Sequence, residues 1–297
     1  MGNSPTVARA FAPGHVTGLF VPETLGKEKL TWGSRGAGLV LDRGVLATAR
    51  RTSGADGLKL RSPAGAHALT ITERALSALL QEVPGAGGLE VEIVHDLPIS
   101  RGLGMSAAGT LAATMAAARV LGLPETSAIA QAHLAEIEGH GGLGGIPAIL
   151  GDGIEVRRSP GLPPHGVVER TPCAVPITLG VLGKAMESPP LLSDPKFLAK
   201  VRKIGEGLME SLPPPPLELD HLLEVSQSFA MELGLGEPRI REALQFCSAR
   251  GFLASQAMLG NTIFAPMVDP ETEAQLERMG FLVYRLKVGA RGANLVA

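Results

Sequence analysis

The clearest pattern in the first half of the chain is a strand followed by a long apolar helix. Residues 89–94 alternate between apolar and polar side chains and are rich in β-branched types, which predicts a strand. Residues 106–120 hold mainly Ala, Leu, Met and Thr without proline, which predicts a buried helix. The segment 98–108 contains two glycines. A glycine-rich loop is therefore expected to join the strand to the helix N-terminus.

The same patterns predict a strand-rich first half and a helix-rich second half. Strands are expected at 6–11, 36–41, 45–49, 154–157, 175–182 and 281–288, the last at a sheet edge. Helices are expected at 68–83, 127–138, 195–212, 217–233, 238–248 and 271–279. Four prolines at 213–216 separate two of these helices, because proline lacks an N–H and clashes inside a helix. We expect an α+β protein with domains at 1–172 and 173–297.

Three local features refine this prediction. Asp42-Arg43-Gly44 is typical of a turn between two strands. Thr126 or Ser127, after a proline, is expected to cap the helix that follows. Residues 254–265 are expected to form a strand or turn that exposes the pair Gly260-Asn261.

Composition narrows the class of protein. The chain has 297 residues, of which 45% are hydrophobic and 19% charged, so an ample core is expected. A net charge of −2 and the lack of a basic run argue against nucleic-acid binding. Cys173 and Cys247 have no metal-binding spacing and are expected to be free thiols in a reducing cytoplasm. No signal-peptide pattern and no membrane-spanning apolar run is found, so a cytoplasmic location is expected.

The glycine-rich loop has the chemistry of an anion site. The first N–H groups of a helix have no helical partner, and the helix dipole is positive there. Gly102 and Gly104 allow close approach of the backbone, and Ser106 adds a hydroxyl. The loop is neither a Walker A sequence nor a dinucleotide-binding fingerprint. The alternative is a tight strand-to-helix turn that binds nothing.

Taken with other segments, this loop resembles the phosphate loop of the GHMP kinases. The segments 11–20, 135–144, 157–170 and 257–262 are similar to archaeal pantoate kinases within that superfamily, and they extend the resemblance over essentially the whole chain. Met105 is a departure, since most members have serine there. The resemblance implies a GHMP kinase-type α+β fold, with a ribosomal S5 domain 2-like N-terminal half and a ferredoxin-like C-terminal half.

The resemblance also implies site residues. The residues assigned to ATP binding are Pro98, Arg101, Gly102, Leu103, Gly104, Met105, Ser106, Ala107 and Ala108. Ser106 and Glu136 are expected to be catalytic and to bind Mg²⁺, which prefers oxygen ligands. Glu138 lies two positions further along the same helix and points to another face, so it is expected to be a solvated carboxylate.

Four residues are candidates for binding the substrate. Arg157 follows a strand and could hold a carboxylate in a bidentate fork, although an ordinary ion pair is the alternative. Arg158 is expected to point the other way as a surface charge. His15 and Thr17 could bond to the substrate, but His15 could equally be structural. Asn261 falls in the third motif of the superfamily, where a plain turn is equally expected.

One departure concerns the reaction itself. Pantoate kinases have an aspartate where this chain has Gly145, and glycine offers no proton acceptor. The enzyme could work without a base, since phosphoryl transfer depends mainly on positioning and charge neutralisation. Alternatively, Asp152 could substitute, although a turn residue is the better interpretation of this aspartate. In the third case the protein binds nucleotide with little or no turnover.

The expected function is therefore ATP-dependent phosphorylation of a small hydroxy-acid, with Mg²⁺ as cofactor. Pantoate, giving 4-phosphopantoate in coenzyme A biosynthesis, is the leading substrate. A homoserine- or mevalonate-type kinase and a nucleotide-binding protein without turnover are the alternatives. A homodimer is possible, and neither a nucleic acid nor a membrane is expected as a partner.

Overall fold

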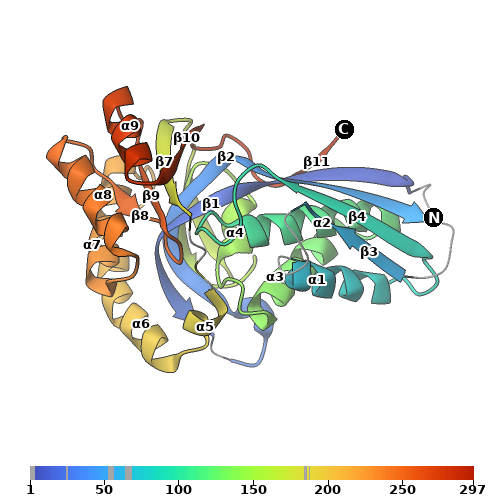
Figure 1. The fold of residues 1–297 in the computed structure, drawn as a ribbon. Helices are drawn as coiled ribbons and strands as arrows, with labels where there is room; N and C mark the ends of the chain where they lie inside the picture. Colours follow the sequence, from blue (N-terminus) through green and yellow to red (C-terminus); the bar gives the residue numbers. More distant parts are fainter. Residues whose placement is uncertain (1–3, 25, 53–56, 64–68, 184–185, 187) are drawn as a thin grey trace.

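The computed structural model describes residues 4–24, 26–52, 57–63, 69–183, 186 and 188–297. Two β-sheets, each covered by helices, make up the described part (Figure 1). The mixture of a large mostly antiparallel sheet, a small antiparallel sheet and separate helices confirms the α+β prediction. No helix in these ranges is long and apolar enough to cross a membrane.

The first sheet is built around two very long antiparallel strands, β1 (Val7–Glu23) and β2 (Gly33–Thr52). Its order is β11-β1-β2-β4-β3. Outside this order, β5 pairs with another part of β2, and β6 pairs with β5. The remaining strands are β3 (Gly57–Arg61), β4 (Gly88–His95), β5 (Ile154–Ser159), β6 (Val167–Thr171) and β11 (Asn294–Val296).

Three helices lie along this sheet: α1 (Thr70–Gln81), α2 (Met105–Leu121) and α3 (Glu125–Glu138) (Figure 1). Helix α2 packs against β1 and β2 and also contacts α1 and α3, so nearly all of its residues are buried. This explains its uniformly apolar sequence, because a helix enclosed on every side needs no polar face. The expected helices are present, although the predicted beginning at Ala68 lies outside the described residues.

Two local predictions in this region are wrong. Asp42-Arg43-Gly44 is not a turn, because β2 runs through it without a break. Pairing with β1 steps from Pro13↔Gly44 to His15↔Val40, so the extra residues form a bulge that absorbs the turn-like sequence. Helix α3 has Pro124 at its N-cap and no side-chain cap bond, so Thr126 and Ser127 lie inside its first turn.

The second sheet has the order β10-β7-β9-β8. Its strands are β7 (Pro176–Leu182), β8 (Ser255–Gln256), β9 (Thr262–Pro266) and β10 (Phe281–Lys287), and the predicted edge position of β10 is confirmed. The other helical segments are η1 (Lys29–Thr31), α4 (Gly145–Ile149), α5 (Ser188–Leu192), α6 (Pro195–Glu210), α7 (Leu219–Leu233), α8 (Pro238–Ala249) and α9 (Pro270–Arg278).

The turn before β9 corrects another prediction. Gly260 and Asn261 are buried, not exposed. A Cβ at Gly260 would collide with the backbone of Arg101 and Gly102, so this turn packs directly on the glycine-rich loop of the first half.

The two sheets are joined by extensive packing. Helices α6 and α7 pack against β1, and β11 returns from the C-terminal end to pair with β1. The division into domains at 172/173 stays a prediction. Cys247 is buried and Cys173 is half-buried, and both are free thiols.

Candidate active site

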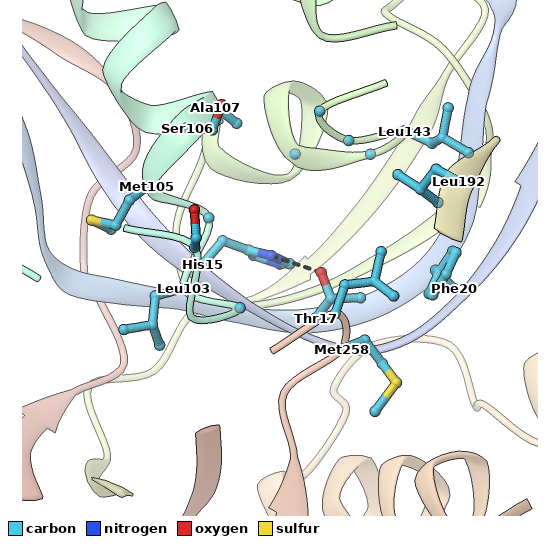
Figure 2. Close-up of a pocket in the computed structure, with 18 of the residues that line it drawn as sticks. His15, Thr17, Phe20, Leu103, Met105, Ser106, Ala107, Leu143, Leu192 and Met258 are labelled. Atoms are coloured by element: carbon cyan, nitrogen blue, oxygen red, sulfur yellow. Dashed lines mark hydrogen bonds between the residues drawn. The ribbon is translucent and has the colours of Figure 1, made fainter. Parts of the chain in front are cut away.

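A cavity of about 670 Å³ opens where the glycine-rich loop, β1, the start of α4 and the second half of the chain meet (Figure 2). It brings together residues from segments that are far apart in the sequence. Its lining includes His15, Thr17, Phe20, Ser34, Thr70, Ile71, residues 99–107, residues 141–145, Arg157, Met186, Leu192, Met258 and Leu259.

The loop between β4 and α2 has the geometry predicted for an anion site. Gly102 and Gly104 have φ values of 81° and 66°, in the region that favours glycine, and Gly104 is the N-cap of α2. A Cβ at Gly104 would lie 3.0 Å from the backbone nitrogen of His15, so a side chain there would crowd β1. Because Ala108 N–H already bonds to Gly104 O at 3.0 Å, the N–H groups of 105–107 are the ones left for an anion.

Most residues predicted to bind ATP line this cavity. The lining members are Arg101, Gly102, Leu103, Gly104, Met105, Ser106 and Ala107. Pro98 and Ala108 lie outside the lining, and Ala108 is fully buried in the core. Their role in ATP binding stays a prediction.

Ser106 and Glu136 are brought together across α2 and α3. Ser106 Oγ donates to Glu136 Oε1 at 2.9 Å, and the Glu136 side chain is only 2% exposed. Burial raises the pKa of Glu136 to about 7, although bonds from Ser106 and Thr110 act in the opposite direction. A Cβ at Gly141 would lie 2.6 Å from Glu136 Oε2, so the glycine run after α3 packs closely around this carboxylate.

This donor set fits a magnesium ion. Mg²⁺ prefers hard oxygen ligands and usually keeps waters and substrate phosphates as its other ligands. A hydroxyl and a buried carboxylate without a cationic partner meet that requirement. In the described ranges, no group of three or more His, Cys, Asp or Glu side chains is placed to hold a metal ion.

A buried charged network borders the cavity at His15 and Arg157. His15 Nε2 and Glu155 Oε1 are 2.9 Å apart, and Arg157 Nη1 forms an ion pair with the same carboxylate oxygen. All three side chains are 3% exposed or less. Glycines of β2 make room for them: a Cβ at Gly38 would lie 2.6 Å from the His15 ring.

The network explains the ionisation of its members. Burial lowers the pKa of His15, although Glu155 acts to raise it. Burial opposes the ionisation of Glu155, but Arg157 and His15 together hold its pKa below the usual value. His15 is therefore neutral and Glu155 is a carboxylate at neutral pH.

Glu155 was not singled out from the sequence. Strand alternation could have indicated this residue. Alternate residues of a strand share a face, and Glu155 stands two positions before Arg157. What the sequence lacked was the partner, since His15 lies 140 residues away along the chain.

Arg157 is buried and held by the protein, and it also lines the cavity. Its Nε donates to Ser34 O at 3.3 Å and its Nη1 pairs with Glu155, while Nη2 has no hydrogen-bond partner among the described residues. One side of the guanidinium is thus held by the protein, and the side chain lines the cavity.

The wall next to Thr17 is apolar. Phe20, Leu143, Leu192 and Met258 surround the Thr17 side chain in Figure 2. Thr17 is half-buried, and its Oγ1 lies 3.2 Å from His15 Nδ1. This part of the cavity would contact methyl or methylene groups of a bound molecule.

Several candidates lie away from the cavity. Glu138 is 34% exposed and pairs with Lys29 and Arg74, as expected for a residue on another face of α3. Arg158 points away from Arg157 and pairs with Glu169 at 2.7 Å. Asn261 is 3% exposed but lies outside the lining, and its role in substrate binding stays a prediction.

Gly145 lines the cavity at the start of α4, and Asp152 does not line it. A Cβ at Gly145 would lie 2.8 Å from the Cβ of Ala107, so the phosphate-loop helix packs against a glycine here. The side chain of Asp152 therefore does not take the place of an aspartate at 145.

Comparison with known proteins gives a consistent result. Residues 70–152 match the GHMP kinases N terminal domain. The chain is 31% identical over 273 residues to the pantoate kinase of Thermococcus kodakarensis, covering 89% of each chain. It is 29% identical over 259 residues to the pantoate kinase of Methanocaldococcus jannaschii, covering 86% of this chain and 90% of the relative.

A solved structure described as a phosphotransferase related to the CoA biosynthesis pathway has the same fold. Its TM-score is 0.82 at 27% identity, with 98% of each chain covered. The resemblance read from the sequence motifs and the GHMP kinase-type fold that it implied are therefore confirmed.

Proposed function

The chain belongs to the pantoate kinase family of the GHMP kinases, and on that premise we propose that it transfers the γ-phosphoryl group of ATP to the 4-hydroxyl of pantoate. The relatives of known activity match it over most of their length and of its own. The single observation that carries the proposal is the cavity. It joins a phosphate loop, a buried arginine and an apolar wall, which are the three features that these two substrates require.

We place the triphosphate on the glycine-rich loop. The N–H groups at the start of α2 and the dipole of that 17-residue helix favour a phosphate there. Arg101 lies on the same loop and lines the cavity, so its charge is available to the phosphates. The close approach permitted by Gly102 and Gly104 brings the phosphate oxygens to the backbone.

We place the pantoate carboxylate at Arg157. Its Nε and Nη1 are held by Ser34 O and Glu155, so the guanidinium is already oriented before the substrate arrives. Pantoate carries two methyl groups next to its 4-hydroxymethyl carbon, and the wall of Phe20, Leu143 and Met258 suits them. Homoserine has an amino group and no methyl group, so it would leave this wall without a partner.

We place a magnesium ion at Ser106 and Glu136. The ion would neutralise charge on the transferring phosphate. Glu136, which burial holds near pKa 7, becomes fully ionised when a cation lies beside it. Ser106 and Glu136 are already hydrogen-bonded to each other, so the two oxygens need little rearrangement.

The reaction then depends on alignment. The loop holds the phosphates and Arg157 holds the acceptor within one cavity. Such positioning supplies a large share of the rate in phosphoryl transfer.

ADP release by the purified protein with Mg-ATP tests this function, with pantoate, homoserine and mevalonate assayed in parallel. We expect turnover with pantoate that is far above the other two acceptors, and loss of it in Ser106→Ala. Nucleotide binding without turnover on any acceptor would contradict the proposal and favour a binding protein.

A further inference from the structure

The cavity lacks a carboxylate to accept a proton. Its described lining contains no Asp or Glu, and position 145 is a glycine. The acceptor hydroxyl must nevertheless lose a proton when its oxygen bonds to phosphorus. His15 is the one histidine among the described lining residues, and a neutral imidazole can accept a proton.

Both ring nitrogens of His15 already have a partner within the protein. Its Nε2 faces Glu155 Oε1 at 2.9 Å and its Nδ1 faces Thr17 Oγ1 at 3.2 Å. Because Glu155 is a carboxylate, it accepts a hydrogen bond and the proton of the neutral ring is on Nε2. Nδ1 therefore accepts the hydroxyl proton of Thr17, the contact drawn as a dashed line in Figure 2. Thr17 also lines the cavity, so the lone pairs of its oxygen are left to accept a bond from a bound molecule.

From this geometry we propose that Thr17, His15 and Glu155 form a proton relay that takes the place of a direct carboxylate base; the proposal rests on the proposed kinase function. The substrate hydroxyl donates to Thr17 Oγ1, and Thr17 passes its own proton to His15 Nδ1. As these protons move, the acceptor oxygen bonds to the γ-phosphorus and the bond to the bridging oxygen of ADP breaks. The products are the phosphate ester, ADP and a protonated His15, which returns its proton to solvent after product release.

The surroundings of the relay suit this role. Glu155 stabilises a protonated ring directly, and its Oε2 is buried without a hydrogen-bond partner in the described part of the chain. Arg157 and Arg170 act in the opposite direction and keep His15 neutral between cycles, together with burial. The ring packs on Gly38, and the backbone N–H of His15 donates to Leu103 O of the glycine-rich loop at 3.0 Å.

Substitutions at two positions, Thr17 and His15, test the relay in the full chain. Thr17→Val removes the hydroxyl and keeps the shape, and Thr17→Ser keeps the hydroxyl. His15→Gln keeps an amide nitrogen toward Glu155 but removes the base. His165→Gln is a matched control, because His165 is exposed and lies outside the cavity lining.

Steady-state kinetics with Mg-ATP and pantoate give the readout. We expect kcat to fall roughly 10²–10⁴-fold in Thr17→Val and His15→Gln, the range of general-base catalysis, with little change in either KM. Thr17→Ser should restore turnover, and His165→Gln should match the wild type. A thermal melt shows whether each variant is folded, and Thr17→Val decides the matter if His15→Gln does not fold.

Two results would overturn the relay while leaving the kinase function intact. One is an unchanged kcat in Thr17→Val. The other is a raised KM for pantoate at constant kcat, since that identifies Thr17 as a binding group only. A wild-type protein that forms no ADP with pantoate would overturn the proposed function, and the relay with it.

Discussion

Two buried carboxylates each contact residues that line the cavity, and the surroundings of the two carboxylates differ. Glu136 on α3 is 2% exposed and is bonded to the Ser106 hydroxyl, and burial raises its pKa to about 7. Glu155 on β5 is fully buried, but Arg157 and His15 outweigh that burial and hold its pKa below the usual value.

The difference is whether the carboxylate already has a cationic partner within the protein. The Glu155 carboxylate is paired with Arg157 inside the protein. Glu136 has no cationic partner among the described residues, so a cation supplied from outside would stabilise its ionised form. This contrast supports the proposal that the organic acceptor binds near Arg157 and that the metal and the triphosphate bind near Ser106 and Glu136.

The largest expected effect comes from removing the charge of Glu136. Glu136→Gln keeps the shape and the bond from Ser106, but it removes the anion that would bind Mg²⁺. Groups that neutralise charge in phosphoryl transfer are worth roughly 10³–10⁵ in rate, so we expect kcat to fall by about 10³-fold or more. A titration of activity with Mg²⁺ checks the cause, because the variant should need a higher concentration. Unchanged turnover at limiting Mg²⁺ would contradict the assignment.

The next effect concerns the other carboxylate. Arg157→Met leaves the Glu155 charge buried beside a neutral side chain, and breaking such a pair costs about 3–5 kcal/mol. Urea unfolding of the single variant and of Arg157→Met with Glu155→Gln measures this cost, and we expect the double variant to recover much of the loss. Arg158→Met is the matched control, since that arginine pairs with a half-exposed glutamate and should cost less. A double variant as unstable as the single one would show that charge burial is not the cause.

The glycine-rich loop and the network around Glu155 also differ in how far they could be predicted from the sequence. The strand, the glycine-rich loop and the start of α2 are contiguous, so local rules for helix ends and glycine were sufficient. Strand alternation likewise placed Arg157 and Arg158 on opposite sides of β5.

The network around Glu155 depends on pairing between segments that are far apart. His15 lies 140 residues from Glu155, and nothing local indicates that β2 pairs with both β1 and β5 and so brings these two side chains together. The same limit explains two errors. Asp42-Arg43-Gly44 has residue types that favour a turn, but pairing with β1 holds the segment in a bulge. Gly260 is typical of an exposed loop, but it is buried against the glycine-rich loop.

The contrast between the carboxylates predicts a pH dependence of folding without Mg²⁺. The folded pKa of Glu136 is about 7 against 4.5 for the ordinary side chain, so the folded state holds a proton that the unfolded state has lost. Stability should therefore decrease as pH rises from 4.5 to 7, by about 3 kcal/mol from this group. Glu155 acts with the opposite sign, and its contribution is lost only as pH falls below 4.5.

Urea unfolding at pH 5 and pH 8 in a chelator measures this decrease, with Glu136→Gln as the comparison. The variant should lose the decrease, and added Mg²⁺ should reduce it in the wild type, since an ion that binds only the folded state stabilises it. Equal pH dependence in both proteins would mean that Glu136 is not a buried acid without a cationic partner.

The smallest effect is expected at a third carboxylate, which serves as a control for the first. Glu138 lies two residues after Glu136 on α3, but it is 34% exposed and pairs with Lys29 at 2.7 Å and Arg74 at 3.0 Å. Exposed pairs of this kind contribute about 0–1 kcal/mol and are weakened by salt. Glu138→Gln should therefore lower stability slightly at low salt, less at high salt, and leave kcat unchanged. A kcat loss comparable to that of Glu136→Gln would mean that both faces of this helix end act on the substrate, and the assignment of the metal to one buried carboxylate would be wrong.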